Sequence, residues 1–100
     1  MDNSNRILIF GREQQSTDEV TRILEAVGFI VTGTLDEGVA IDLVGSSDYE
    51  ALLIGEEVSP SDRRYVATKS RYANPSLTVV VVQSPESVLT QLWQAGVSMQ

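Results

Sequence analysis

Cysteine and histidine are both absent from the chain. Without cysteine there are no disulfides, no thiolate nucleophile and no thiolate ligands for zinc. Without histidine the commonest general acid–base group of enzymes is missing. Carboxylates, hydroxyls, lysine and arginine are the side chains left for catalysis. We therefore expect a protein that is not an enzyme and that holds no metal or cofactor.

Long apolar runs are absent too. No stretch approaches the roughly 20 apolar residues that a membrane-spanning helix needs. The first five residues are polar and lack the basic and then apolar order of a signal peptide. These two features predict a cytoplasmic protein that does not enter a membrane.

Positive charge is scarce, with 14 acidic residues against 7 basic ones and a net charge of −7. A surface of that sign does not favour nucleic acid as a partner. The basic residues are concentrated in one stretch that contains Arg63, Arg64, Lys69 and Arg71. This stretch is interpreted either as a solvated helix face, the commoner case, or as a docking site for an acidic partner.

The 100 residues, 42% of them hydrophobic, are enough for one domain with one core, which we expect to span residues 1–100. Apolar and β-branched runs predict four strands, at Asn5–Gly11, Phe29–Thr34, Tyr49–Gly55 and Leu77–Val82. Helical spacing and capping residues predict four helices between and after them, beginning near Ser16, at Asp36 or Glu37, at Ser59-Pro60 and at Ser84-Pro85. The first helix start rests on Ser16 and Glu19, which have the spacing of a capping box.

Strands that alternate with helices predict a parallel sheet with helices on both faces. The expected fold class is α/β, a flavodoxin-like three-layer sandwich with a four-stranded parallel sheet in the order 2-1-3-4. Ligands of such sheets bind at the carboxyl ends of the strands.

The order of these patterns resembles one known family. The segments that carry the resemblance are Arg6–Phe10, Asp48–Ile54, Asn74–Val82 and Leu92–Val97. They are similar, in this order, to the first strand, the third strand, the entry into the fourth strand and the end of the fourth helix of the receiver domain of bacterial response regulators. The resemblance spans nearly the whole chain and implies the receiver fold.

The resemblance does not extend to the chemistry of the family. Receivers hold magnesium with two acidic residues after the first strand, where this chain has Gly11 and Arg12. Their phospho-accepting aspartate ends the third strand, where this chain has Gly55, and their Ser or Thr after the fourth strand matches Gln83, with Ser84 next. The resemblance therefore implies a degenerate pseudo-receiver without phosphotransfer activity.

The leading interpretation is a non-catalytic protein-interaction or dimerisation module in bacterial signalling. No fifth strand follows the fourth, so the fourth is expected at a sheet edge, which invites pairing with another chain. Three explanations are open: residues 97–100 cover this edge, a partner covers it, or the sequence is a piece of a longer protein. We expect a protein partner or a homodimer that uses this edge or the last helix, through Val79, Val81, Leu89 and Trp93. Trp93 is open to two interpretations, a core residue or an interface anchor.

The alternative is a module that binds a small ligand or an anion at the carboxyl ends of the strands. Its predicted residues are Gly11, Arg12, Glu13, Gly55, Glu56 and Gln83. Glu13, Asp36, Glu56 and Glu57 are interpreted as a solvated acidic loop rather than as ligands of a divalent metal. Arg12 is expected to pair with Glu13 or Glu56, or to point to water.

Overall fold

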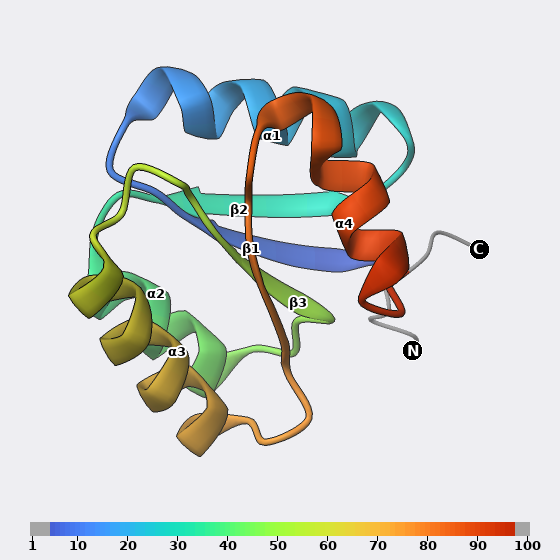
Figure 1. Cartoon of the computed structure of the whole chain (residues 1–100). Helices are drawn as coiled ribbons and strands as arrows, with labels where there is room; N and C mark the ends of the chain where they lie inside the picture. The colour runs from blue at the N-terminus through green and yellow to red at the C-terminus, as the bar shows by residue number, and fades with distance from the viewer. Residues whose placement is uncertain (1–4, 98–100) are drawn as a thin grey trace.

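The structure is a computed structural model that describes residues 5–97. Strands and helices alternate along the chain (Figure 1). Their bounds are β1 Arg6–Phe10, α1 Gln14–Ala26, β2 Ile30–Thr34, α2 Glu37–Ser46, β3 Ala51–Ile54, α3 Pro60–Ala73, β4 Thr78–Val81, the 3₁₀ turn η1 Pro85–Ser87 and α4 Val88–Gln94. The predicted number and order of elements are confirmed.

The four strands form one parallel sheet in the order β2-β1-β3-β4. Ile9 of β1 is paired with Gly33 of β2 on one side and with Leu53 of β3 on the other. Leu53 is paired in turn with Val80 of β4. The flavodoxin-like α/β fold and its strand order are as predicted, and β4 lies at the edge of the sheet.

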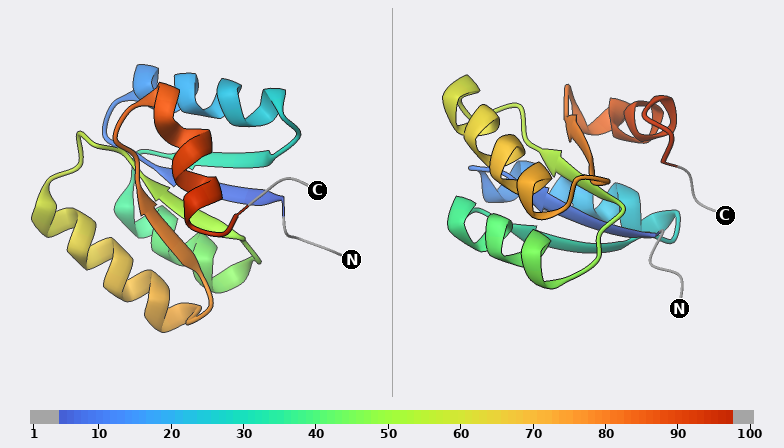
Figure 2. Two further views of the ribbon diagram at one scale, coloured as in Figure 1. Left: turned by 45° about the vertical axis from the view of Figure 1, so that its right-hand side comes forward. Right: turned by 90° about the horizontal axis from the view of Figure 1, so that it is seen from below.

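Helices cover both faces of the sheet, α1 and α4 on one face and α2 and α3 on the other (Figure 2). The two central strands, β1 and β3, therefore bury both of their faces, which explains the unbroken apolar run of β1. Ile7 and Ile9 belong to the core under α1 and α4, whereas Leu8 and Phe10 belong to the core under α2 and α3. All four side chains are at most 2% exposed.

Two helix starts are capped as the sequence predicts. The Asp36 carboxylate accepts a hydrogen bond from the backbone N–H of Val39 at 3.0 Å, so Asp36 is the N-cap of α2. The Ser59 hydroxyl accepts one from the N–H of Asp62 at 3.3 Å, and Pro60 follows as the first residue of α3.

The predicted capping box at Ser16 is wrong. Helix α1 begins at Gln14, and the backbone N–H of Thr17 donates to the carbonyl of Glu13 at 3.1 Å to close the first turn. Ser16 lies inside this turn, and its hydroxyl donates to the Glu13 carboxylate at 2.6 Å. The helix starts earlier because the extended backbone of Glu13 already places its carbonyl as the first acceptor.

None of the helices within residues 5–97 has both the length and the apolar character needed to cross a membrane. The last helix also differs from the prediction in form. Its first turn, Pro85–Ser87, is a 3₁₀ turn, and regular α-helix extends only over Val88–Gln94. Gly96 follows with φ of 91°, a left-handed conformation that glycine adopts readily and that ends the helix.

Candidate functional site

Two glycines mark the place where a ligand would be expected, at the carboxyl ends of β1 and β3. The Gly11 N–H donates to the carbonyl of Thr34 at 3.1 Å, and the Gly55 N–H donates to the carbonyl of Phe10 at 2.9 Å. The backbone thus brings Gly11 and Gly55 together beside the crossover point of the sheet, as the sequence predicts. Binding sites of open α/β sheets lie at this point.

The carboxylate of Glu57 occupies the space over both glycines. A Cβ atom on Gly55 would lie 2.5 and 2.7 Å from the two carboxylate oxygens, and one on Gly11 would lie 2.9 Å from Oε2. The backbone N–H of Arg12 donates to the same oxygen at 3.0 Å. Glu57 therefore takes the position that a bound anion would take at these strand ends.

Little room is left around the Glu57 carboxylate. The hollow at this edge has a volume of about 30 Å³, and its lining includes Thr17, Gly55 and Glu57. This volume is that of about one water molecule in the liquid. The Glu57 side chain thus fills the space over the ends of β1 and β3. A separate hollow of about 180 Å³ lies beside the end of β2, with Gln14, Thr17 and Thr34 in its lining.

Arg12 connects three elements at this edge. Its guanidinium donates to the carbonyl of Leu35 at 3.2 Å and to the carboxylate of Asp62 at 3.1 Å. It lies 3.6 Å from the carboxylate of Glu37 and 4.9 Å from the ring centre of Phe10. The prediction that Arg12 pairs with Glu13 or Glu56, or points to water, is wrong. Arg12 pairs instead with Glu37 at the start of α2 and with Asp62 at the start of α3.

The other predicted ligand residues have separate places and partners. Glu13 is the N-cap residue of α1 and accepts from Ser16. Glu56 is exposed in the turn after β3, and Gln83 follows β4, where its backbone N–H donates to the side chain of Gln91. Within residues 5–97 no three acidic side chains are grouped so that they could hold a metal ion.

The second candidate region is the free side of β4. The N–H groups of Thr78 and Val82 donate to backbone carbonyls on the β3 side. The acceptors are the carbonyl of Glu50, just before β3, and that of Ile54, at its end. Because the backbone groups of a strand alternate in direction, those of Val79 and Val81 point to the other side. No strand in residues 5–97 lies there, so β4 has an open edge.

Gln91 covers only the carboxyl end of this edge. Its side-chain amide donates to the carbonyl of Val81 at 2.7 Å and accepts from the N–H of Gln83 at 2.9 Å. One side chain of α4 thus makes the two hydrogen bonds that a residue of a neighbouring strand would make. This role was not predicted, because nothing in the spacing of Gln91 distinguishes it from an exposed helix residue.

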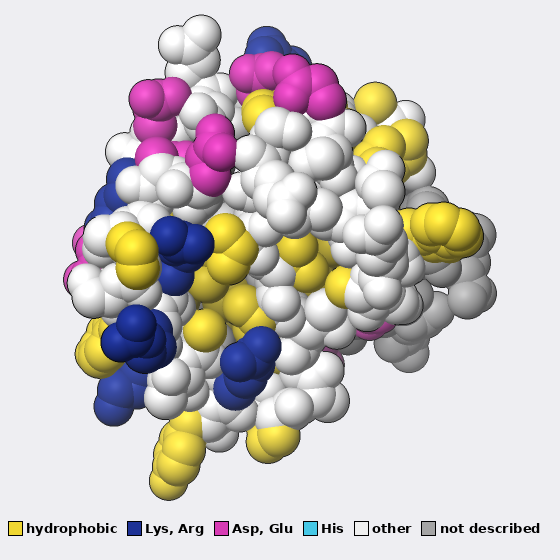
Figure 3. Space-filling view, viewed as in Figure 1, with side chains coloured by type: hydrophobic (Ala, Val, Ile, Leu, Met, Phe, Trp, Pro, Cys, Tyr) yellow, Lys and Arg dark blue, Asp and Glu magenta, His cyan; other side chains and the backbone are white. Residues whose placement is uncertain are grey.

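A groove of about 350 Å³ runs between α3 and the open side of β4. Apolar side chains form its floor and arginines of α3 form its rim (Figure 3). The residues that line it are Ile54, Pro60, Arg63, Arg64, Ala67, Thr68, Arg71, Val79 and Val81. The arginines of the basic stretch therefore lie beside the predicted interface residues Val79 and Val81.

The exposed Trp93 lies on α4. Its side chain is 72% exposed, which favours the interface interpretation over the core interpretation. Leu89 is partly buried and packs against the core under α1 and α4. The α4 segment from Val88 to Gln94 contains no charged residue, although the chain as a whole is acidic.

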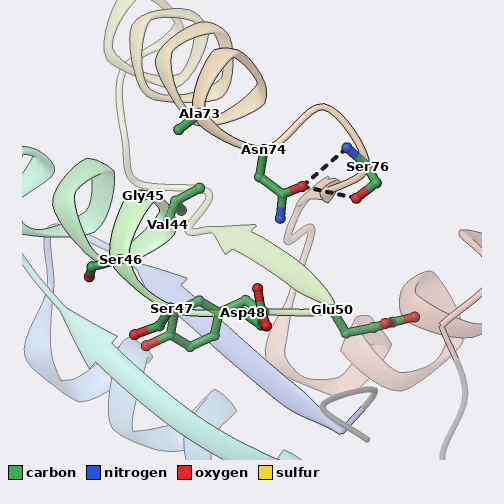
Figure 4. A pocket seen from close by; sticks show the side chains of 10 residues that line it. Val44, Gly45, Ser46, Ser47, Asp48, Glu50, Ala73, Asn74 and Ser76 are labelled. Atoms are coloured by element: carbon green, nitrogen blue, oxygen red, sulfur yellow. Dashed lines mark hydrogen bonds between the residues drawn. The ribbon is translucent and has the colours of Figure 1, made fainter.

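A larger, shallow hollow lies at the amino ends of β3 and β4, where α2 and α3 end (Figure 4). It has a volume of about 580 Å³ and a lining that is mostly polar, with Ser46, Ser47, Glu50, Asn74 and Ser76 among its residues. The Asn74 side chain accepts hydrogen bonds from the backbone and hydroxyl of Ser76, which orders this rim. Sequence reasoning gave no signal for this hollow.

The fold and these sites define a flavodoxin-like α/β domain whose strand ends are closed and whose sheet has an open edge. No protein-family model matches the chain, and no curated protein matches it. Among solved structures it is similar to a "Putative pilus assembly-related protein" from Burkholderia pseudomallei K96243. The sequence identity is 17%, the TM-score is 0.63, and the match covers 98% of this chain and 78% of that chain. This likeness shows the fold.

Proposed function

We propose that the chain is a non-catalytic, receiver-like protein-interaction module of bacterial signalling. Its interaction surface is the free side of β4 with the helices α3 and α4 that flank it. The open edge carries the proposal, because an uncovered strand edge with partly exposed valines is a template for pairing with another chain. The module acts by surface recognition and neither makes nor breaks a covalent bond.

The closed strand ends support the non-catalytic part of this proposal. Gly55 stands where a receiver has its phospho-accepting aspartate, and Glu57 fills the space above it. We expect no stable mass increase after incubation with acetyl phosphate and magnesium. A phospho-adduct in the intact-mass spectrum would contradict the pseudo-receiver assignment. We do not propose a ligand site here, since the remaining hollow holds about 30 Å³.

We propose that the chain self-associates through α4. Two copies of an acidic protein repel each other over most of their surfaces, but the uncharged segment Val88–Gln94 can meet its own copy without like charges. Trp93 supplies an exposed aromatic side chain of the kind that anchors interfaces. We propose a homodimer in which the α4 helices of two protomers are in contact.

Light scattering over a range of concentrations tests the homodimer. The proposal predicts the mass of a dimer for the wild type and of a monomer for Trp93→Ser, since loss of an anchor costs about 2 kcal/mol of binding energy or more. Tyr72→Ser is the matched control, because Tyr72 is a 90% exposed aromatic residue on α3. A wild type that stays monomeric at every concentration would exclude the homodimer.

A further inference from the structure

We infer that the groove between α3 and β4 binds an extended acidic segment of a partner protein, which adds to the sheet as a strand beside β4. The inference rests on the proposed function in that it takes the free side of β4 as the interaction surface. It goes further by naming the mode of binding and the charge of the partner.

The backbone of β4 determines how a partner segment binds. Val79 presents its N–H and carbonyl to the free side, and Val81 presents its N–H, while the Val81 carbonyl is taken by Gln91. Within residues 5–97 no residue bonds to the Val79 groups on that side. These groups form main-chain hydrogen bonds with any extended peptide, and Gln91 limits the paired length at the carboxyl end.

The walls of the groove determine which side chains the segment carries. Arg64 and Arg71 are exposed on the side of α3 that lines the groove. Arg63 lies beside them, and its Nε donates to the carbonyl of Val58 at 3.0 Å. Neither Arg64 nor Arg71 forms an ion pair with another residue in the described part of the chain.

The distribution of charge specifies an acidic partner. In Figure 3 the basic side chains lie to the left of and below the apolar floor of the groove, whereas acidic side chains gather at the top of this face. A chain with a net charge of −7 repels acidic partners elsewhere and attracts them here. A basic segment would place like charges beside Arg64 and Arg71. The segment therefore carries carboxylates at alternate positions, on the face that looks toward α3.

A second copy of this chain fits the groove less well than an acidic segment does. Two β4 edges related by a two-fold axis pair in antiparallel fashion and keep the same face of each sheet on the same side. This arrangement brings the two α3 helices together on the same side of the paired β4 strands. Arg64 and Arg71 of both protomers would then face each other, and like charges at an interface disfavour binding.

Fluorescence anisotropy with three labelled peptides tests the inference. The probe is an eight-residue peptide in which Glu and Val alternate, and the controls replace Glu with Lys or place a proline at the centre. The probe is expected to bind, with an affinity that falls as salt is raised. The Lys peptide is expected not to bind, and the proline peptide to bind weakly because it lacks a backbone donor.

Charge reversal on α3 locates the binding site. The double variant Arg64→Glu/Arg71→Glu is expected to bind the probe with an affinity at least about tenfold lower, because two attractive charges become repulsive. Lys69→Glu is the matched control on the same helix, because Lys69 lies over the ring of Tyr65 and does not line the groove. Its affinity is expected to stay within about twofold of the wild type.

Three results would overturn the inference: no binding of the Glu-Val peptide, equal binding of the Lys-Val peptide, or binding that the double variant does not weaken. Circular dichroism of each variant verifies that it is folded. Light scattering of the same samples separates the two proposals. A wild-type dimer that binds no acidic peptide overturns the groove alone, whereas a monomer that binds the peptide overturns only the homodimer.

Discussion

The carboxyl ends of the strands and the free side of β4 are the two places where this sheet could bind another molecule. They differ in how far the protein's own side chains occupy them. At the strand ends, the Glu57 carboxylate takes the position of a bound anion, and the Arg12 guanidinium is bonded to Asp62 of the protein itself. Along the open edge, Gln91 covers the carboxyl end of β4, and no other residue between 5 and 97 bonds to the free side of this strand.

This difference indicates which region is structural and which is free to bind. Polar groups at the strand ends are satisfied inside the protein, so a ligand would have to displace Glu57 before it could bind there. Within residues 5–97 the backbone groups of Val79 on the free side have no partner, so a second chain adds hydrogen bonds there without breaking any.

The largest effect on stability is expected at Gly11. In Gly11→Ala the new Cβ would lie 2.5 Å from the hydroxyl of the buried Thr17 and 2.9 Å from the Glu57 carboxylate. Overpacking of this kind should lower the free energy of unfolding by about 2 kcal/mol. Urea denaturation measures the change.

Gly45→Ala is the matched control for Gly11→Ala. Gly45 lies in α2 and a Cβ there would meet nothing within 4 Å, so alanine should raise the free energy of unfolding by about 0.5–1 kcal/mol. If the two variants change stability alike, the strand ends are not as tightly closed as the structure indicates.

Arg12→Ala is expected to have the next largest effect. It removes the guanidinium that holds the loop after β1 to Leu35 and to the starts of α2 and α3. Because the side chain is 37% exposed, solvent screens these charges, and the expected loss of stability is about 1.5 kcal/mol. A double-mutant cycle with Asp62→Ala should give a coupling energy of about 0.5 kcal/mol. A coupling energy of zero would mean that this ion pair does not close the site.

Gln91→Ala should change the open edge rather than the strand ends. The variant loses the hydrogen bonds to Val81 and Gln83, which lowers the free energy of unfolding by about 1 kcal/mol. It also lengthens the uncovered edge, so we expect faster loss of soluble protein on storage at high concentration. Gln15→Ala, at an exposed position of α1, is the control and should behave as the wild type does.

The smallest change in stability is expected for Trp93→Ser. Because the Trp93 side chain is 72% exposed, its removal should alter the free energy of unfolding by no more than about 0.5 kcal/mol. Thermal unfolding of a dilute sample measures this without a contribution from self-association. A loss of several kcal/mol would show that Trp93 supports the core, and the light-scattering result for this variant would then need another explanation.

Much of the fold could be predicted from local patterns. The apolar run of β1 indicated a strand buried on both faces, and Ser59-Pro60 and Asp36 marked the starts of two helices. The start of α1 could not be assigned in the same way. Ser16 has the spacing of a capping box. The extended residue before the helix is nevertheless Glu13, and its carbonyl accepts the first helical hydrogen bond, from Thr17.

The site was only partly predictable, because its decisive contacts join residues far apart in sequence. Gly11 and Gly55 were expected to meet at the strand ends, and they do. The acids that pair with Arg12 belong to the starts of α2 and α3, and only the folded chain brings them to one place. The position of Glu57 over both glycines likewise depends on the turn after β3.

Amide NMR spectra recorded while the Glu-Val peptide is added to the protein test the contrast between the two regions most directly. The proposed interaction surface predicts that signals of the free side of β4, with the amides of Val79 and Val81 foremost, shift as the peptide binds. The amides of Gly11, Arg12 and Gly55 should not move. Shifts at these strand-end residues, with no change at Val79 and Val81, would contradict the proposal.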